Sequence, residues 1–162
     1  NKGFSHLRMT KTISSKLFFD VFTQFGFNDF LLMKNRKLAG SGLRYKMGSN
    51  DRMNTFLGIG LMQENEIYDL VNEPEKKLLR STNYLRWNIN ITENTELNNT
   101  VYYQFSSSDI NDYRLLYDGS IDFSVDENLS FFIELNYRYD NDPHGDMVKS
   151  YVQLNNGIEF TF

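Results

Sequence analysis

The sequence predicts an all-β fold, an antiparallel up-and-down transmembrane β-barrel, and three features of the chain indicate it. Apolar and polar residues alternate with a period of two over long segments, which is typical of strands that have two different faces. The connections between these segments alternate between tight turns and longer polar loops. The last segment keeps the alternation up to an aromatic C-terminal residue.

Residues 129–140 show the alternation most clearly. One face of this segment is apolar and consists of Leu129, Phe131, Ile133, Leu135, Tyr137 and Tyr139. Strands of soluble antiparallel sheets usually have about five or six residues, whereas a tilted strand needs roughly nine to eleven to cross a bilayer. Because a bilayer leaves no backbone group unpaired, strands cross it only as a closed sheet. We therefore expect the apolar faces to contact lipid and the polar faces to line the interior.

We expect nine strands in one domain, residues 1–162, with no linker. They cover residues 4–10, 16–28, 37–47, 54–64, 85–91, 97–105, 113–125, 129–140 and 147–162. Tight turns are expected near residues 13–15, 49–53, 93–94 and 126–128, and longer loops over residues 28–36, 68–77, 107–112 and 141–146. In a transmembrane barrel the short turns lie on the periplasmic side and the long loops lie outside.

The composition excludes several classes of protein. The chain has no cysteine, which excludes disulfides, cysteine nucleophiles and thiolate metal sites. Its 17 Lys and Arg against 21 Asp and Glu argue against a basic nucleic-acid binder, so no nucleic acid is expected as a partner. No run of eighteen apolar residues is present, which excludes a transmembrane helix.

The final segment resembles the C-terminal recognition signal that outer-membrane proteins present to the barrel assembly machinery. This expected signal consists of Ile158, Phe160 and Phe162, and Asn156 interrupts the alternating series before it. We therefore expect the barrel assembly machinery to be a partner during biogenesis.

The inward positions of the predicted strands carry charges of both signs. The expected lumen-facing set is Arg8, Asp20, Arg44, Lys46, Glu64, Arg86, Arg114, Asp118, Asp122, Glu134, Arg138, Lys149 and Glu159. Such a set forms either a salt-bridged interior that holds the wall in shape or a polar conduit whose charged constriction selects small solutes. We favour the structural role, because a buried charge without a partner is costly.

Glycines at positions 40, 42, 58 and 60 also fall on inward positions of two adjacent strands. We expect them to let large inward side chains such as Phe22, Phe56 or Tyr102 lie flat against the wall, with Gly26 extending the patch. The alternative is the close approach of a ligand.

No catalytic, cofactor-binding or metal site is predicted. Residues 140–146 begin like a calcium loop, but position five is His144 and position twelve is Tyr151, where a bidentate Glu is needed. The only other histidine, His6, has no G-x-S-x-G context, and the adjacent Ser5 points to the opposite face. We therefore expect no enzymatic activity.

Several strand and turn motifs resemble a known family. They are residues 37–45 (KLAGSGLRY), 57–61 (LGIGL), 102–104 (YYQ), 112–116 (DYRLL) and 139–143 (YDNDP). Together they are similar to the YdiY-like, salt-induced outer-membrane protein family, a domain of unknown function. The resemblance implies a barrel of about twelve strands in the outer membrane of Gram-negative bacteria. Because nine strands were counted, we expect the N-terminal strands of the family domain to be missing here.

These observations predict an outer-membrane β-barrel in contact with lipid and lipopolysaccharide. We expect either a passive small-solute channel or an envelope component linked to salt stress. One alternative is a structural subunit docked to another envelope protein. The other is a soluble β-barrel that binds a small apolar ligand, in which the apolar faces would turn inward.

Overall fold

The computed structural model describes residues 1–70, 75–145 and 147–160, and their dominant element is one antiparallel sheet. Its strands are β1 (Lys2–Thr12), β2 (Leu17–Asn28), β3 (Met33–Ser49), β4 (Met53–Tyr68), β5 (Glu75–Thr92), β6 (Thr95–Ser106), β7 (Tyr113–Ser124), β8 (Leu129–Asp140) and β9 (Ser150–Phe160). A single 3-10 turn, η1 (Asp29–Leu31), follows β2. Within these residues, no helix has the length and apolar character needed to cross a bilayer.

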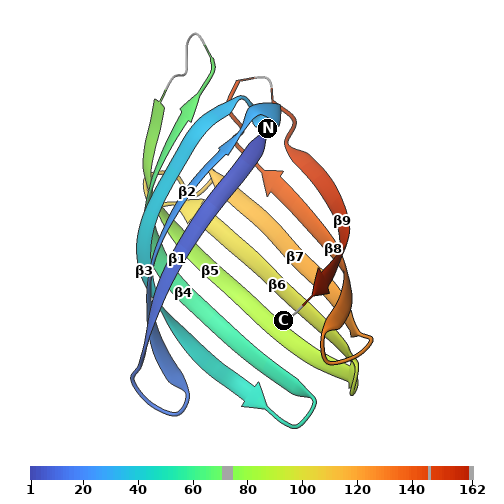
Figure 1. The fold of residues 1–162 in the computed structure, drawn as a ribbon. Helices are drawn as coiled ribbons and strands as arrows, with labels where there is room; N and C mark the ends of the chain where they lie inside the picture. The colour runs from blue at the N-terminus through green and yellow to red at the C-terminus, as the bar shows by residue number, and fades with distance from the viewer. Residues whose placement is uncertain (71–74, 146, 161–162) are drawn as a thin grey trace.

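Each strand pairs with its neighbours in sequence, so the sheet has the order β1 to β9 without a crossover. The prediction of nine up-and-down strands is therefore confirmed. The sheet curls into an incomplete barrel, with the turns after β1, β3, β5 and β7 at one end and the longer connections at the other (Figure 1). Among the described residues, β1 and β9 do not pair with each other.

Three strands extend further toward the long-loop end of the sheet than the alternation of polarity predicts. β5 begins at Glu75 rather than at residue 85, and β3 and β4 also extend beyond their predicted bounds toward this end. In these extensions Leu78 faces inward and Ser81 and Asn83 face outward, which breaks the alternation of polarity while the backbone pairing continues. The predicted last strand is too long at its start, because residues 147–149 precede β9, and its last two residues lie outside the described residues.

The two faces of the sheet have opposite polarity. Large apolar side chains on the convex face are exposed, such as Ile133 at 47% and Leu135 at 40%. The concave face carries most of the buried side chains. Within the described part of the chain, eleven polar or charged residues are buried but only three apolar ones, Leu38, Met62 and Tyr68. This distribution is the reverse of a water-soluble domain, in which apolar residues form the core.

Glycines allow close approach on the concave face of β3 and β4. Gly42 and Gly60 are directly paired, and a Cβ on either would lie 2.6 Å from a backbone oxygen of the opposite strand. The Tyr84 ring covers Gly58, and the Phe22 ring covers Gly40. Phe22 is one of the side chains expected to lie flat on a glycine, whereas Tyr84 covers Gly58 in place of Phe56 or Tyr102.

We predict that Gly58→Ala destabilises the barrel by about 1–3 kcal/mol, because the new methyl group would overlap the Tyr84 ring. The free energy of unfolding can be measured in detergent or lipid by urea titration. The matched control is Gly48→Ala, since a Cβ at Gly48 meets nothing within 4 Å. Equal stability of the two variants would contradict the packing role of Gly58.

Candidate functional site

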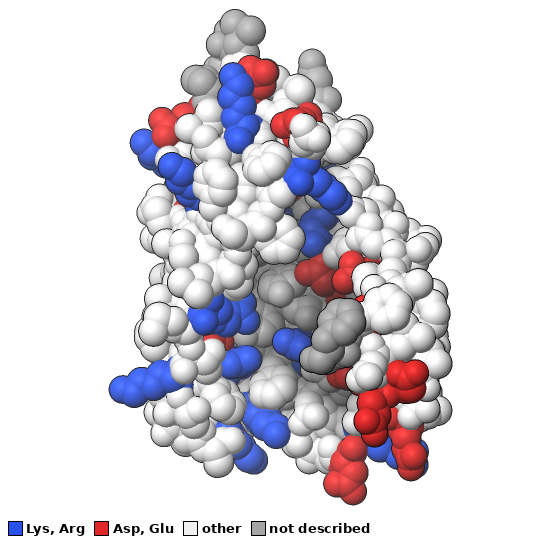
Figure 2. All heavy atoms as spheres, viewed as in Figure 1, with Lys and Arg blue, Asp and Glu red and all other residues white. Residues whose placement is uncertain are grey.

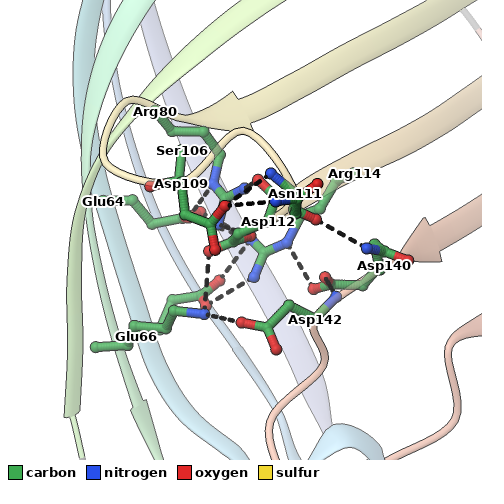
Figure 3. Close-up of polar contacts among 12 residues, drawn as sticks. Glu64, Glu66, Arg80, Ser106, Asp109, Asn111, Asp112, Arg114, Asp140 and Asp142 are labelled. Atoms are coloured by element: carbon green, nitrogen blue, oxygen red, sulfur yellow. Dashed lines mark hydrogen bonds and ion pairs between the residues drawn. The ribbon is translucent and has the colours of Figure 1, made fainter.

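The most densely charged part of the concave face lies at the long-loop end of the sheet. Figure 3 shows side chains from β4, β5, β7 and β8, and from the β6–β7 and β8–β9 loops, converging there. We call the paired charged side chains of this group, together with Arg36 on β3, the mouth network. It consists of Arg36, Glu64, Glu66, Lys76, Arg80, Asp112, Arg114, Asp140 and Asp142.

Glu64 on β4 is the centre of the mouth network, with a side chain only 1% exposed. Three guanidinium groups surround its carboxylate. Arg80 donates from Nε to Oε2 at 3.0 Å, and Arg114 donates from Nη1 to both oxygens at 3.2 Å. Arg36 donates to Oε1 from Nε at 2.8 Å. A carboxylate this deeply buried stays ionised only with such partners, because moving an unpaired charge out of water costs on the order of several kcal/mol.

A second set of carboxylates neutralises the same arginines. Arg114 donates from Nη2 to Glu66 at 3.0 Å and from Nε to Asp140 at 2.7 Å, so its guanidinium group binds three acids. Arg80, which has no exposed side-chain surface, lies 2.9 Å from Asp112. The network therefore links β3, β4, β5, β7 and β8 with the β6–β7 loop, and it fixes the shape of the wall at this end.

The β8–β9 loop folds over the mouth network. The His144 ring stacks on Tyr68 with a centroid distance of 3.9 Å, and its Nε2 lies 3.4 Å from Glu66 Oε2. Lys76 at the start of β5 donates to Asp142 at 3.0 Å. This hydrogen bond lowers the pKa of the Asp142 carboxyl below its ordinary value. A polar contact on one side and a ring stack on the other thus hold the loop.

A cavity of about 170 Å³ lies between this loop and the wall. Its charged lining includes Arg36, Arg114, Arg138 and Lys149, and its apolar lining includes Leu116. Leu116 is an apolar residue at a concave position of β7, so it interrupts the alternation of polarity in that strand. The cavity is large enough for several water molecules or a small solute.

The structure gives each residue of the expected lumen-facing set a definite place. Glu64 and Arg114 belong to the mouth network. Lys149 is exposed in the β8–β9 loop, ahead of β9. The others occupy concave positions on β1, β2, β3, β5, β7, β8 and β9, since directly paired residues share a face; they are Arg8, Asp20, Arg44, Lys46, Arg86, Asp118, Asp122, Glu134, Arg138 and Glu159.

Two ion pairs hold residues of this set outside the mouth network. Asp20 is buried, accepts from Thr10 Oγ1 at 2.5 Å and lies 3.3 Å from Arg44. Arg138 pairs with Asp118 on the neighbouring strand.

Sequence reasoning missed seven members of the mouth network: Arg36, Glu66, Lys76, Arg80, Asp112, Asp140 and Asp142. Arg36, Lys76 and Asp112 fall in segments predicted as loops, and Glu66 and Arg80 lie beyond the predicted ends of their strands. Glu66 is two residues from Glu64, and Arg80 is six residues from Arg86, so each shares a face with a predicted lumen-facing residue if its strand continues. This spacing is the signal that could have found these two residues. Asp140 and Asp142 belong to the segment that begins like a calcium loop.

The acidic residues of the segment that begins like a calcium loop do not converge on one point. Asp140 binds Arg114 and Asp142 binds Lys76, so the two carboxylates point to separate cations. Over residues 1–70, 75–145 and 147–160, no group of three or more His, Asp or Glu side chains could hold a metal ion. At the C-terminus, Ile158 and Phe160 are exposed on the convex face, and Phe162 lies outside the described residues.

The up-and-down sheet with a polar concave face defines a porin-like β-barrel fold. Among solved structures, the NanC porin in a rhombohedral crystal form is similar, with a TM-score of 0.67 and 10% sequence identity over 100% of this chain and 80% of the porin chain. The chain belongs to the family described as "Protein of unknown function, DUF481", whose model matches residues 1–162. This is consistent with the resemblance to the YdiY-like family. No curated protein matches the sequence.

We predict that Arg80→Met destabilises the protein by about 3–5 kcal/mol, because it leaves Glu64 and Asp112 with an uncompensated share of buried negative charge. Urea unfolding followed by tryptophan fluorescence measures the change. The control is Lys77→Met, which removes the exposed pair with Glu75 and should cost about 0–1 kcal/mol. Similar losses in both variants would contradict a structural role for the mouth network.

We also predict that acid loosens the β8–β9 loop. The folded-state pKa of Asp142 is lowered, so its stabilising contribution is present above the unfolded-state pKa and is lost as the pH falls through the folded-state pKa. Hydrogen exchange of the backbone amides of residues 141, 142, 144 and 145 should therefore speed up below about pH 4, relative to the exchange rate of an unstructured peptide at the same pH. In Asp142→Asn this part of the acid response should be absent. An identical response in both proteins would refute the role of Asp142.

Proposed function

We propose that this protein is a non-enzymatic outer-membrane β-barrel that conducts small hydrophilic solutes along its concave face. One observation carries the proposal: the charged residues are buried on the inside of the sheet while the large apolar residues are exposed on the outside. In water an exposed apolar surface of this extent would drive aggregation. In a bilayer the same surface contacts lipid chains and the polar interior holds water.

The lengths of the strands support a membrane location. Every described strand has eleven residues or more. A strand tilted across a bilayer needs roughly nine to eleven. The apolar convex positions would contact the lipids and lipopolysaccharide of the outer membrane, and Ile158 and Phe160 would present the assembly signal to the barrel assembly machinery.

The mouth network would form the constriction of the conduit. It lies at the end of the long loops, which face outward in outer-membrane barrels. The β8–β9 loop narrows the same end, since Asp142 and His144 hold it against β4 and β5. Solutes would pass through the space between the loop and the cavity wall.

A structural subunit of an envelope complex is the second candidate. The unpaired edges of β1 and β9 favour it, because free backbone donors and acceptors on an edge strand can pair with another chain. In that case side chains would fill the interior, and no solute or ion would pass through it.

Planar-bilayer recording of the detergent-refolded protein tests the conduit. We expect stepwise currents, and we expect a higher single-channel conductance for a Lys76→Gln, Asp142→Asn variant, because it removes the polar contact that holds the β8–β9 loop. The matched control is Glu75→Gln, Lys77→Gln, which removes an exposed pair at the same height and should conduct as the unmodified protein does. A barrel that folds and inserts but passes no current would overturn the conduit and favour the structural subunit.

A further inference from the structure

Below the mouth network, most positive and most negative side chains occupy different halves of the concave face. The positive half is formed by β1 to β5 and carries Arg8, Arg44, Lys46 and Arg86. The negative half is formed by β6 to β9 and carries Glu96, Asp118, Asp122, Glu134 and Glu159. In Figure 2 the basic side chains gather at the left and centre of the lower hollow, and most acidic ones at its lower right.

The sign changes within a single row of paired residues. Lys46 pairs with Phe56, Phe56 with Arg86, Arg86 with Thr100 and Thr100 with Asp118. This row of concave side chains is therefore positive on β3 and β5 and negative on β7. The division between the halves follows the strands themselves and does not depend on loop positions.

The charges of the two halves are not neutralised across the hollow. Among the described residues, the ion pairs in this region are Arg44 with Asp20 and Arg138 with Asp118, and each joins two residues of the same half. These pairs leave Arg8, Lys46 and Arg86 on the positive half. They leave the four remaining carboxylates on the negative half: Glu96, Asp122, Glu134 and Glu159.

Neutral or aromatic partners hold several of these charges. Asp122 accepts from Asn98 at 2.9 Å and from Ser120 at 2.8 Å. Arg8 lies 5.9 Å from the centre of the Phe22 ring. Hydrogen bonds from neutral donors and cation–π contacts orient a charge without cancelling it.

One direct pair places like charges opposite each other. Glu96 and Asp122 are cross-strand partners on the concave face. Like charges in this arrangement destabilise a sheet. An arrangement chosen for stability alone would place a cation at one of these positions, so the pair indicates a role for negative potential on this wall.

We propose that these two halves form a transverse electric field that makes the conduit selective for small zwitterionic solutes. This inference rests on the proposed function. A zwitterion aligns its ammonium group with the acidic half and its carboxylate with the basic half, and it gains energy from both. A simple ion is attracted by one half and repelled by the other, while an uncharged solute gains nothing. Low-dielectric walls around a water-filled passage focus the field between opposed charges, which strengthens this alignment.

Solute uptake into proteoliposomes tests the selectivity with four probes of similar size: β-alanine, propionamide, propionate and propylammonium. We expect β-alanine to enter several-fold faster than propionamide through the unmodified protein. The basic-half variant is R8Q/K46Q/R86Q, and the acidic-half variant is D122N/E134Q/E159Q. In either variant, the rate for β-alanine should fall to that for propionamide.

Reversal potentials in a KCl gradient supply a second readout. The unmodified protein should be weakly selective, the basic-half variant should shift toward cations and the acidic-half variant toward anions. The control is K11Q/K37Q, which removes two positive charges from the convex face and should shift neither readout. If a triple variant does not fold, the single variants R86Q and D122N should shift the potentials in the same directions by smaller amounts.

The outcomes separate this inference from the proposed function. Currents whose selectivity ignores the basic-half and acidic-half variants, or β-alanine uptake no faster than that of propionamide, would leave the conduit standing and overturn the transverse field. A folded, inserted barrel without current would overturn both.

Discussion

Successive side chains along each β-strand of this protein point to opposite faces, so one strand contacts two different environments. Ile133 and Leu135 are exposed on the convex face, and Glu134 between them lies on the concave one. Repeated over nine strands, this alternation produces an apolar outside and a charged inside, and a sheet with these two faces curls around its polar side.

Charge is used in two different ways along the concave face. At the long-loop end, Glu64 and its three arginines are buried and mutually paired, and their mutual attraction offsets the cost of removing them from water. Nearer the short turns, Arg86 is exposed to the hollow, and Asp122 faces a second acid across the strand pair. The first arrangement stabilises the wall. The second does not, and its charges are available to act on whatever occupies the hollow.

The bounds of β2, β7 and β8 were predicted to within one residue. The period is clearest in β8, where every outward residue is apolar or aromatic. β5 could not be delimited, since Ser81 and Asn83 on its convex face and Leu78 on its concave face hide the period. Arg80 and Glu66 were missed because they lie in strand extensions where polar and apolar residues do not alternate regularly. Of the mouth network, Glu64, Arg114 and Asp140 lie inside predicted strands, and only Glu64 and Arg114 belong to the expected lumen-facing set.

Local periodicity and the spacing of turns are enough to predict the class of fold, the number of strands and which residues share a face. Which charges meet depends on the three-dimensional arrangement of the strands. Arg114 and Glu64 are fifty residues apart, and their contact depends on the register and curvature of four strands. Alternation assigns a residue to a face, but it carries no information about its height on the wall or its distance across the hollow. Those positions follow from the tilt and curl of the whole sheet.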